Sequence, residues 1–294
     1  MKISMILLEK ILVMNKFKEI NYLSEIAKDY DFFFIDLWGV IHNGVKLFDN
    51  VIETLDCLKK IKKKIFFLTN APRRSNVIKK QLLEFGLQSF LYDDVISSGE
   101  ITWHSLRSKK NLNCFLIGPP RDHHLIEGLN LNIVKDPRIV DVVVNTGPWG
   151  DGDSLENYKP ILNELIKSKP LMICSNPDKT VIRGEKFMIC AGLLAEYYEK
   201  LGGNVEYLGK PYPEIYEKCF ELSSEQNKTK FLIIGDSLDN DIKGALNNKI
   251  DSLLVTSGIH RKVNNNKNID IEKLHDLMMK KNIFSKFVIE KLTW

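Results

Sequence analysis

The chain has 294 residues, with 44% hydrophobic, 27% charged and 10% aromatic side chains. This composition excludes the disordered, fibrous and repeat classes of protein, and the length fits one large or two modest domains. The formal net charge of +4 is small beside 42 basic and 38 acidic side chains, so it indicates neither a nucleic-acid nor a membrane partner.

The N-terminal segment and the cysteines bear on where the protein works. Residues 1–13 are partly apolar, but Glu9 and Lys10 interrupt them and no small-residue cleavage site follows. We therefore interpret them as an N-terminal extension or an early start rather than a signal peptide. No stretch approaches the roughly 18 apolar residues that cross a bilayer. The cysteines are odd in number, far apart and without a C-x-x-C pair, which predicts free thiols and a cytoplasmic location: Cys57, Cys114, Cys174, Cys190 and Cys219.

The first third of the chain has the pattern of a strand, a helix and a second strand. Continuous apolar runs at 32–35 and 65–68 each end in polar residues, which is typical of strands buried on both faces of a parallel sheet. Residues 48–60 between them carry Val51, Ile52, Leu55 and Leu58 at helical spacing. The segment therefore predicts a βαβ unit.

Two more parts of the chain show the same pattern of apolar strands and helices. In the middle block the pattern predicts strands at 115–118, 140–144 and 171–174 and a helix at 158–167. The last block predicts strands at 231–234 and 252–255.

Aspartates distinguish the outer blocks from the middle one. The strands at 32–35 and 231–234 each lead into an aspartate, whereas the strands of the middle block do not. We therefore predict an α/β fold with a Rossmann-like parallel-sheet core, formed by residues 14–97 and 207–294, and an inserted α/β domain at 98–206.

Three carboxylates are candidates for one site. Asp36 ends the first strand, where open α/β sheets bind their ligands, and is the leading candidate for a nucleophile. A carboxylate attacks phosphorus only when the negative charge between them is neutralised, which Mg²⁺ achieves. Asp236 ends another apolar strand, and Asp241 opens the helix that follows, in a better position than Asp239. Taken singly, each strand-end aspartate could instead be a helix N-cap.

Two further residues complete a phosphate site. Thr69, in Thr69-Asn70 after the second strand, offers a hydroxyl that can donate to a transferring phosphoryl group. Lys210, in Gly209-Lys210-Pro211, supplies a positive charge. The Thr69 motif or the Lys210 motif alone carries little information. Four motifs in the chain order Asp36, Thr69, Lys210 and Asp236 are hard to obtain by chance.

These residues resemble the haloacid dehalogenase-like hydrolases, in particular the subclass IIA phosphatases that act on sugar phosphates or 4-nitrophenyl phosphate. The resemblance covers nearly the whole chain and rests on four motifs: Asp36-Leu37-Trp38-Gly39-Val40, Leu68-Thr69-Asn70, Gly209-Lys210-Pro211 and Gly235-Asp236-Ser237-Leu238-Asp239-Asn240-Asp241. It implies that Asp36, the backbone carbonyl of Trp38 and Asp236 bind Mg²⁺, and that Asp241 supports the metal through its water shell.

Members of this subclass carry a large α/β cap, of the C2 type, between the second and third motifs, which agrees with the insert at 98–206. Within it, Asn176-Pro177-Asp178 is similar to the pattern near the substrate, and residues 190–194 to a packed helix. The resemblance thus implies a set of catalytic and substrate-binding residues: Asp36, Thr69 and Lys210 for catalysis, and Thr69, Asn70, Asn176, Asp178 and Lys210 for the substrate. A homodimer through the cap is left open.

Trp38 departs from the family pattern. Most phosphatases of the family have an aspartate there, two residues after the nucleophile, as a general acid and base, and an indole cannot exchange a proton. His42 and His260 are candidates to replace it, although both also fit ordinary loop residues.

The sequence therefore predicts a Mg²⁺-dependent hydrolase that cleaves a small phosphomonoester, such as a sugar phosphate, nucleotide or cofactor phosphate, through an aspartyl-phosphate. Trp38 motivates a second hypothesis, a protein that binds or senses phosphorylated metabolites and turns them over slowly. A dehalogenase-like hydrolase is the third, but dehalogenases of this superfamily do without the metal and would not need Asp236 and Asp241.

Overall fold

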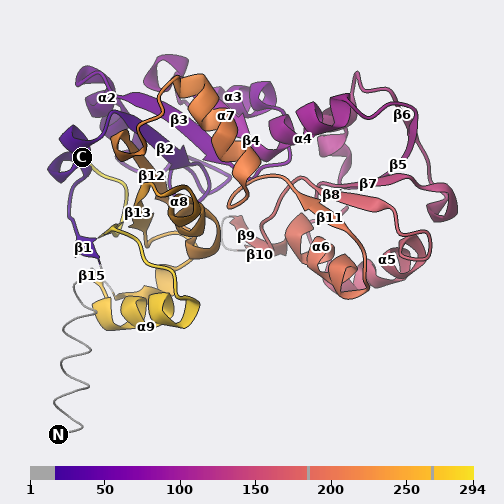
Figure 1. Cartoon of the computed structure of the whole chain (residues 1–294). Coiled ribbons are helices and arrows are strands. Elements are labelled where there is room, and N and C mark those ends of the chain that lie inside the picture. The colour runs from indigo at the N-terminus through magenta and orange to yellow at the C-terminus, as the bar shows by residue number, and fades with distance from the viewer. Residues whose placement is uncertain (1–16, 184–185, 266–267) are drawn as a thin grey trace, which may run out of the picture. The chain divides into compact units, whose positions relative to one another are not determined.

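The computed structural model describes residues 17–183, 186–265 and 268–294 (Figure 1). The N-terminal extension expected at 1–13 lies outside the described residues. The chain divides into two compact units. One comprises the described residues up to Phe67 together with Gly86–Asp94 and Ser223–Trp294, and the other comprises Leu68–Phe85 and Val95–Leu222. The domain bounds expected from the sequence, 14–97 with 207–294 and 98–206, stay a prediction.

The larger sheet has seven strands in the order β1-β16-β13-β12-β2-β3-β4. From β1 to β2 its neighbouring strands run parallel. The chain passes from one unit to the other within β3 and again within β4. The strands are β1 Lys18–Glu19, β2 Phe32–Asp36, β3 Lys64–Thr69, β4 Asp94–Ser97, β12 Phe231–Gly235, β13 Asp251–Val255 and β16 Phe287–Ile289.

Strands β2 and β12 lie side by side, and their register fixes where the aspartates emerge (Figure 1). Phe33, Phe34 and Ile35 are buried, as expected of a strand covered on both faces. Ile234 of β12 pairs with Ile35 of β2. Because the two strands are parallel and in this register, their carboxyl ends meet at the same edge of the sheet. The predicted parallel α/β fold is confirmed.

The helices of this unit are α2 Val51–Lys60, α8 Lys243–Asn248 and α9 Ile271–Lys281. Helix α2 buries Val51, Leu55 and Leu58 as predicted, but Ile52 is 47% exposed and does not belong to the packed face. Short helical turns and a small hairpin complete the unit: η1 Leu23–Glu25, η2 Ala27–Asp29, η3 Ser89–Leu91, η7 Lys228–Lys230, η8 Leu238–Ile242, η9 Arg261–Val263, β14 Asn264–Asn265 and β15 Asn268–Ile269.

The second unit is built on a five-stranded parallel sheet in the order β11-β8-β7-β5-β6. It confirms the α/β character predicted for the insert. An antiparallel hairpin, β9 Thr180–Arg183 with β10 Lys186–Ile189, was not predicted. The other elements are β5 Leu112–Ile117, β6 Leu131–Ile133, β7 Val142–Asn145, β8 Leu171–Cys174, β11 Val205–Tyr207, α3 Ser75–Glu84, α4 Ser98–Arg107, α5 Lys159–Leu165, α6 Ala191–Lys200, α7 Pro213–Ser223, η4 Pro120–Ile126, η5 Pro137–Ile139 and η6 Leu155–Asn157.

Helices α5 and α6 lie along this sheet (Figure 1), and their apolar side chains pack with those of the strands in one hydrophobic core. Leu162 of α5 and Tyr198 of α6 are fully buried beside Val143 and Met172 of the strands. All five cysteines are free thiols, as expected. Within the described residues, no helix is both long and apolar enough to cross a membrane.

Candidate active site

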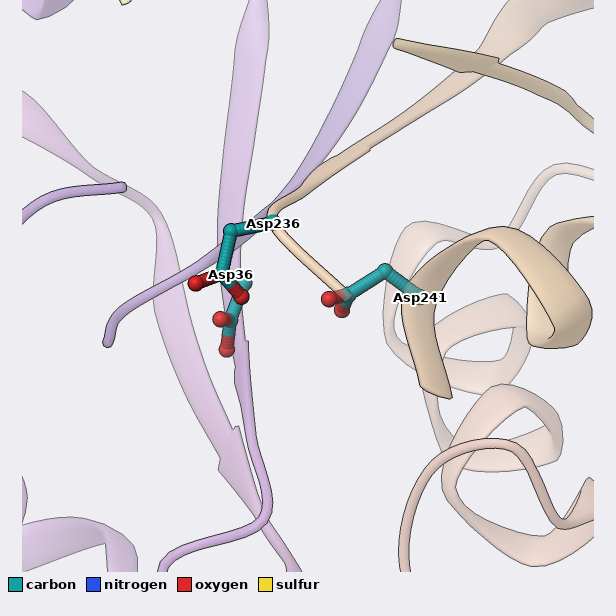
Figure 2. Close-up of side chains that lie close together, drawn as sticks. All are labelled: Asp36, Asp236 and Asp241. Carbon is teal, nitrogen blue, oxygen red and sulfur yellow. The ribbon is translucent and has the colours of Figure 1, made fainter. Parts of the chain in front are cut away.

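Three carboxylates converge at the carboxyl edge of the larger sheet. Asp36 ends β2, Asp236 directly follows β12, and Asp241 lies in the helical turn η8. One oxygen from each lies within 4.8 Å of the others. Figure 2 shows the side chains of Asp36 and Asp236 close together, with Asp241 directed toward them from the start of its helix. The structure thus brings together three of the predicted metal-site residues.

The chain holds Asp236 tightly through backbone contacts. The N–H group of Ile259 donates to Asp236 Oδ2 at 2.7 Å. A Cβ atom on Gly39 or on Gly258 would lie 2.0 Å from the same oxygen, so neither position admits a side chain without movement. The loop after β2 and the loop after β13 therefore contact this carboxylate from two directions. Gly39 belongs to the Asp36 motif, but the sequence does not show that either glycine lies against Asp236.

Asp241 is fixed by its own loop. The N–H group of Ser237 donates to Asp241 Oδ2 at 3.1 Å, and only 1% of Asp241 is exposed. Gly235 lets the carboxylate approach, since a Cβ there would lie 2.0 Å from Asp241 Cγ. Asp239 points elsewhere, because its carboxylate pairs with Lys281 of α9 at 2.7 Å. The preference for Asp241 over Asp239 agrees with this geometry.

The donor set fits a hard divalent cation. Asp36, Asp236 and Asp241 are exposed by 6%, 9% and 1%. Buried carboxylates at this separation repel one another when ionised, and a cation among them offsets that repulsion. Carboxylate oxygens are the ligands that Mg²⁺ and Ca²⁺ prefer. These residues therefore suit such an ion.

Trp38 folds back onto its own loop. Its ring packs on Gly44, where a Cβ would lie 2.3 Å from the indole, and meets the His42 ring edge to face at 5.2 Å. The Gly44 N–H group donates to His42 Nδ1 at 3.1 Å. Burial lowers the pKa of His42 to about 4. At neutral pH His42 is therefore a neutral ring that packs on Trp38, and it lacks the second, acidic ring proton that an imidazolium could give as a general acid.

Gly44→Ala is expected to destabilise the folded protein by about 1–3 kcal/mol, because its φ of +82° strains an L side chain and the new Cβ would collide with Trp38. Urea denaturation measures the loss. Gly86→Ala is the matched control, since Gly86 also has a positive φ of +91° but nothing within 4 Å of a Cβ. It should lose only about 1 kcal/mol from backbone strain. Equal losses would show that the Trp38 contact contributes nothing.

His260 supports the loop that carries the aspartates. The Leu238 N–H group donates to His260 Nε2 at 3.2 Å, so this ring nitrogen accepts a hydrogen bond from the backbone. Burial lowers the pKa of His260 below its ordinary value. Together with the Ile259 N–H bond to Asp236, this places the segment after β13 against the segment after β12 at two points.

The other predicted site residues lie in the second unit. Thr69 and Lys210 are 1% and 2% exposed. Thr69 Oγ1 accepts from the N–H of Ala71 at 3.2 Å, and Lys210 Nζ donates to the carbonyl oxygen of Leu68 at 3.0 Å. Asn176 Oδ1 accepts from the N–H of Asp178 at 3.1 Å.

Asn70 connects two of these residues. Its side chain donates to Asp178 Oδ1 at 2.8 Å and to the carbonyl oxygen of Lys210 at 3.0 Å. Within the second unit, the structure therefore joins buried Asn70 and Lys210 with partly buried Asp178 in one hydrogen-bond network.

Comparison with known proteins agrees with these motifs. Residues 33–132 match a family model described as haloacid dehalogenase-like hydrolase, and residues 207–277 match a model described as HAD-hydrolase-like. The segments include the loops that carry Asp36, Asp236 and Asp241.

Several known proteins are similar over most of the chain. A hydrolase of the haloacid dehalogenase-like family from Brucella suis is 30% identical, with a TM-score of 0.82 over 93% of this chain and 100% of that one. An acid sugar phosphatase from Staphylococcus epidermidis is 23% identical over 79% of this chain and 88% of its own length. A glycerol phosphate phosphatase from Mycobacterium tuberculosis, solved with magnesium, is 22% identical, with a TM-score of 0.63 over 80% of this chain and 70% of that one. The chain therefore belongs to the haloacid dehalogenase-like hydrolase family, with the subclass IIA features that its sequence predicted, and is a hydrolase.

Proposed function

We propose that this hydrolase is a Mg²⁺-dependent phosphatase that cleaves a small phosphomonoester with Asp36 as the nucleophile. The observation that carries the proposal is the cluster of Asp36, Asp236 and Asp241, three buried carboxylates with oxygens within 4.8 Å of one another. The acid sugar phosphatase and the glycerol phosphate phosphatase among the similar proteins support a phosphorylated metabolite as the substrate class.

The metal site would use Asp36, Asp236 and the backbone carbonyl of Trp38, with Asp241 supporting the metal through its water shell. The bound ion would neutralise charge on the phosphate and the carboxylate. Mg²⁺ is proposed as that ion because the donor set is made of hard oxygens, and a similar glycerol phosphate phosphatase was solved with magnesium.

In the proposed first step, Asp36 attacks phosphorus, the bond to the leaving oxygen breaks, and an aspartyl-phosphate remains. Water then attacks this phosphorus and releases inorganic phosphate, which regenerates Asp36. The roles of Thr69 and Lys210 at the phosphoryl group are proposed from their motifs, as are Asn176 and Asp178 near the substrate. A cytoplasmic location and a homodimer through the cap likewise stay predictions.

A panel of phosphorylated sugars, nucleotides and cofactors, assayed with Mg²⁺, tests the proposal. At least one compound should be hydrolysed at an ordinary enzyme rate, on the order of 1–10³ s⁻¹. EDTA should reduce this rate to background, and excess Mg²⁺ should restore it. Tight binding without turnover would instead support the binding protein that Trp38 motivates, and phosphate release that EDTA leaves unchanged would contradict the metal dependence. The dehalogenase-like alternative predicts halide release that a chelator leaves unchanged.

A further inference from the structure

The side chain of Asn70 is buried in a network of four hydrogen bonds within the second unit. Asn70 directly follows β3 and is 4% exposed. Its Nδ2 donates to the Lys210 carbonyl oxygen at 3.0 Å and to Asp178 Oδ1 at 2.8 Å. Its Oδ1 accepts from the Lys210 N–H at 2.7 Å and, at a longer 3.4 Å, from Ser98 Oγ. One side chain therefore contacts three distant segments.

These bonds use the whole hydrogen-bonding capacity of the amide. An asparagine side chain has two N–H donors and one carbonyl oxygen with two lone pairs. The partners also fix which atom is which, because the Lys210 N–H can only donate and the Lys210 carbonyl can only accept. A substrate oxygen would have to displace an existing partner of Asn70. The geometry thus disfavours the direct substrate contact that the sequence predicted for Asn70.

The network holds Lys210 at both polar atoms of its backbone. Its Nζ is held as well, by the carbonyl oxygen of Leu68 at 3.0 Å, and only 2% of the residue is exposed. Gly209 allows this close approach, since a Cβ there would lie 2.0 Å from Ser98 Oγ and 2.7 Å from Asn70 Oδ1. A long, flexible lysine is thereby fixed along its length.

The same amide reaches the segment between β8 and β9. Asp178 is itself tied to the start of α6, because the Gly192 N–H group donates to the Asp178 carbonyl oxygen at 3.0 Å. A Cβ on Gly192 would lie 2.2 Å from the carbonyl oxygen of Pro177, so helix and loop are in direct contact. This segment is therefore connected to Lys210 through Asn70.

We propose that Asn70 is a positioning residue that fixes Lys210 for catalysis and couples it to Asp178. The inference rests on the role proposed above for Lys210. It assigns Asn70 to the support of the lysine, and the bond from Asn70 to Asp178 connects the segment proposed near the substrate to that lysine. A misplaced lysine charge weakens transition-state stabilisation, so loss of Asn70 should lower kcat more than it raises KM.

A reciprocal exchange of side chains tests the coupling. Asn70→Asp keeps the shape but removes both donors and places a carboxylate against Asp178, so kcat should fall about 10- to 100-fold with KM changed less than about threefold. Asp178→Asn keeps an acceptor for Asn70, so its loss of kcat should be smaller than that of Asn70→Asp. In the double variant, the amide introduced at position 178 can donate to the carboxylate introduced at position 70. There kcat should recover about five- to tenfold relative to Asn70→Asp, although the bond to the Lys210 carbonyl stays lost.

Thermal unfolding of the four proteins gives a readout that does not depend on turnover. The midpoint should fall in Asn70→Asp and rise again in the double variant. This result is expected even if the wild-type protein hydrolyses no phosphate ester, so a failure of the proposed function is distinguishable from a failure of the network. Asn70→Ser, which removes the same donors without adding charge, replaces Asn70→Asp in the kinetic comparison if that variant does not fold.

Two outcomes would overturn the proposal. A raised KM with unchanged kcat in Asn70→Asp or Asn70→Ser would assign Asn70 to substrate binding. A double variant that recovers neither kcat nor the unfolding midpoint would show that Asn70 and Asp178 act independently. Ser98→Ala, which removes only the long bond at 3.4 Å, is the control and should stay within about threefold of wild-type kcat.

Discussion

Asp36→Asn is expected to lower kcat for the preferred phosphate ester by at least about 10³-fold at saturating Mg²⁺. An amide oxygen is a far weaker nucleophile than a carboxylate, and the substitution also removes one of three charges from the proposed metal site. Steady-state kinetics of the purified variant measure the effect. Full metal-dependent activity in this variant would contradict the role of Asp36.

The same variant separates electrostatics from packing. Asp36, Asp236 and Asp241 crowd negative charge into a buried space, so removing one charge should relieve repulsion when no metal is bound. In EDTA, the unfolding midpoint of Asp36→Asn should therefore equal or exceed that of the wild type. In Mg²⁺ the wild type should gain stability from binding, and the variant should gain much less.

Asp239→Asn provides the matched control. Asp239 lies in the same loop as Asp236 and Asp241, but its carboxylate pairs with Lys281 at a partly exposed site. A surface ion pair of this kind contributes at most about 1 kcal/mol, so the variant should keep near-wild-type kcat and the same response to Mg²⁺. An equal loss of activity in both variants would indicate general damage to the loop.

The strands in the middle of the two larger sheets and the position of the carboxylate cluster were predictable from the sequence, for a physical reason. A parallel strand buried on both faces is apolar along its length, so Phe33 to Ile35 and the similar run before Asp236 stand out. Such strands place their first polar residue at the same edge of the sheet. Asp36 and Asp236 were therefore found without knowledge of the strand order.

Residues whose role depends on their neighbours in space were not predictable. The sequence predicts Asn70 as a substrate ligand but does not reveal its bonds to Lys210 and Asp178, which lie far away in the sequence. The sequence predicts His42 as a candidate acid or base but does not reveal that the ring is buried and accepts a hydrogen bond from Gly44. Ile52 fits a helical pattern but lies on the exposed side of α2. In each case the local sequence shows the chemical type of the side chain but not its burial or its partners in space.

Trp38 leads to an expectation about which esters are cleaved quickly. An indole cannot give a proton to the leaving oxygen, and His42 is neutral at physiological pH because burial lowers its pKa to about 4. Without a proton from either residue, the leaving oxygen departs as an anion. For a series of aryl phosphates, kcat/KM should therefore fall steeply with the pKa of the leaving phenol, by about five- to tenfold per unit.

Trp38→Asp supplies the missing proton donor and should change that dependence. Hydrolysis of alkyl phosphates, which have poor leaving groups, should rise by up to about 10²–10⁴-fold, whereas the best aryl phosphates should change little. Trp38→Asn is the control, because it removes the same packing on Gly44 and His42 but offers no proton to exchange. If wild-type kcat/KM proves independent of the leaving group, a proton must reach the leaving oxygen from a group other than residue 38. If both variants behave alike, a carboxyl group at position 38 does not donate to the leaving oxygen.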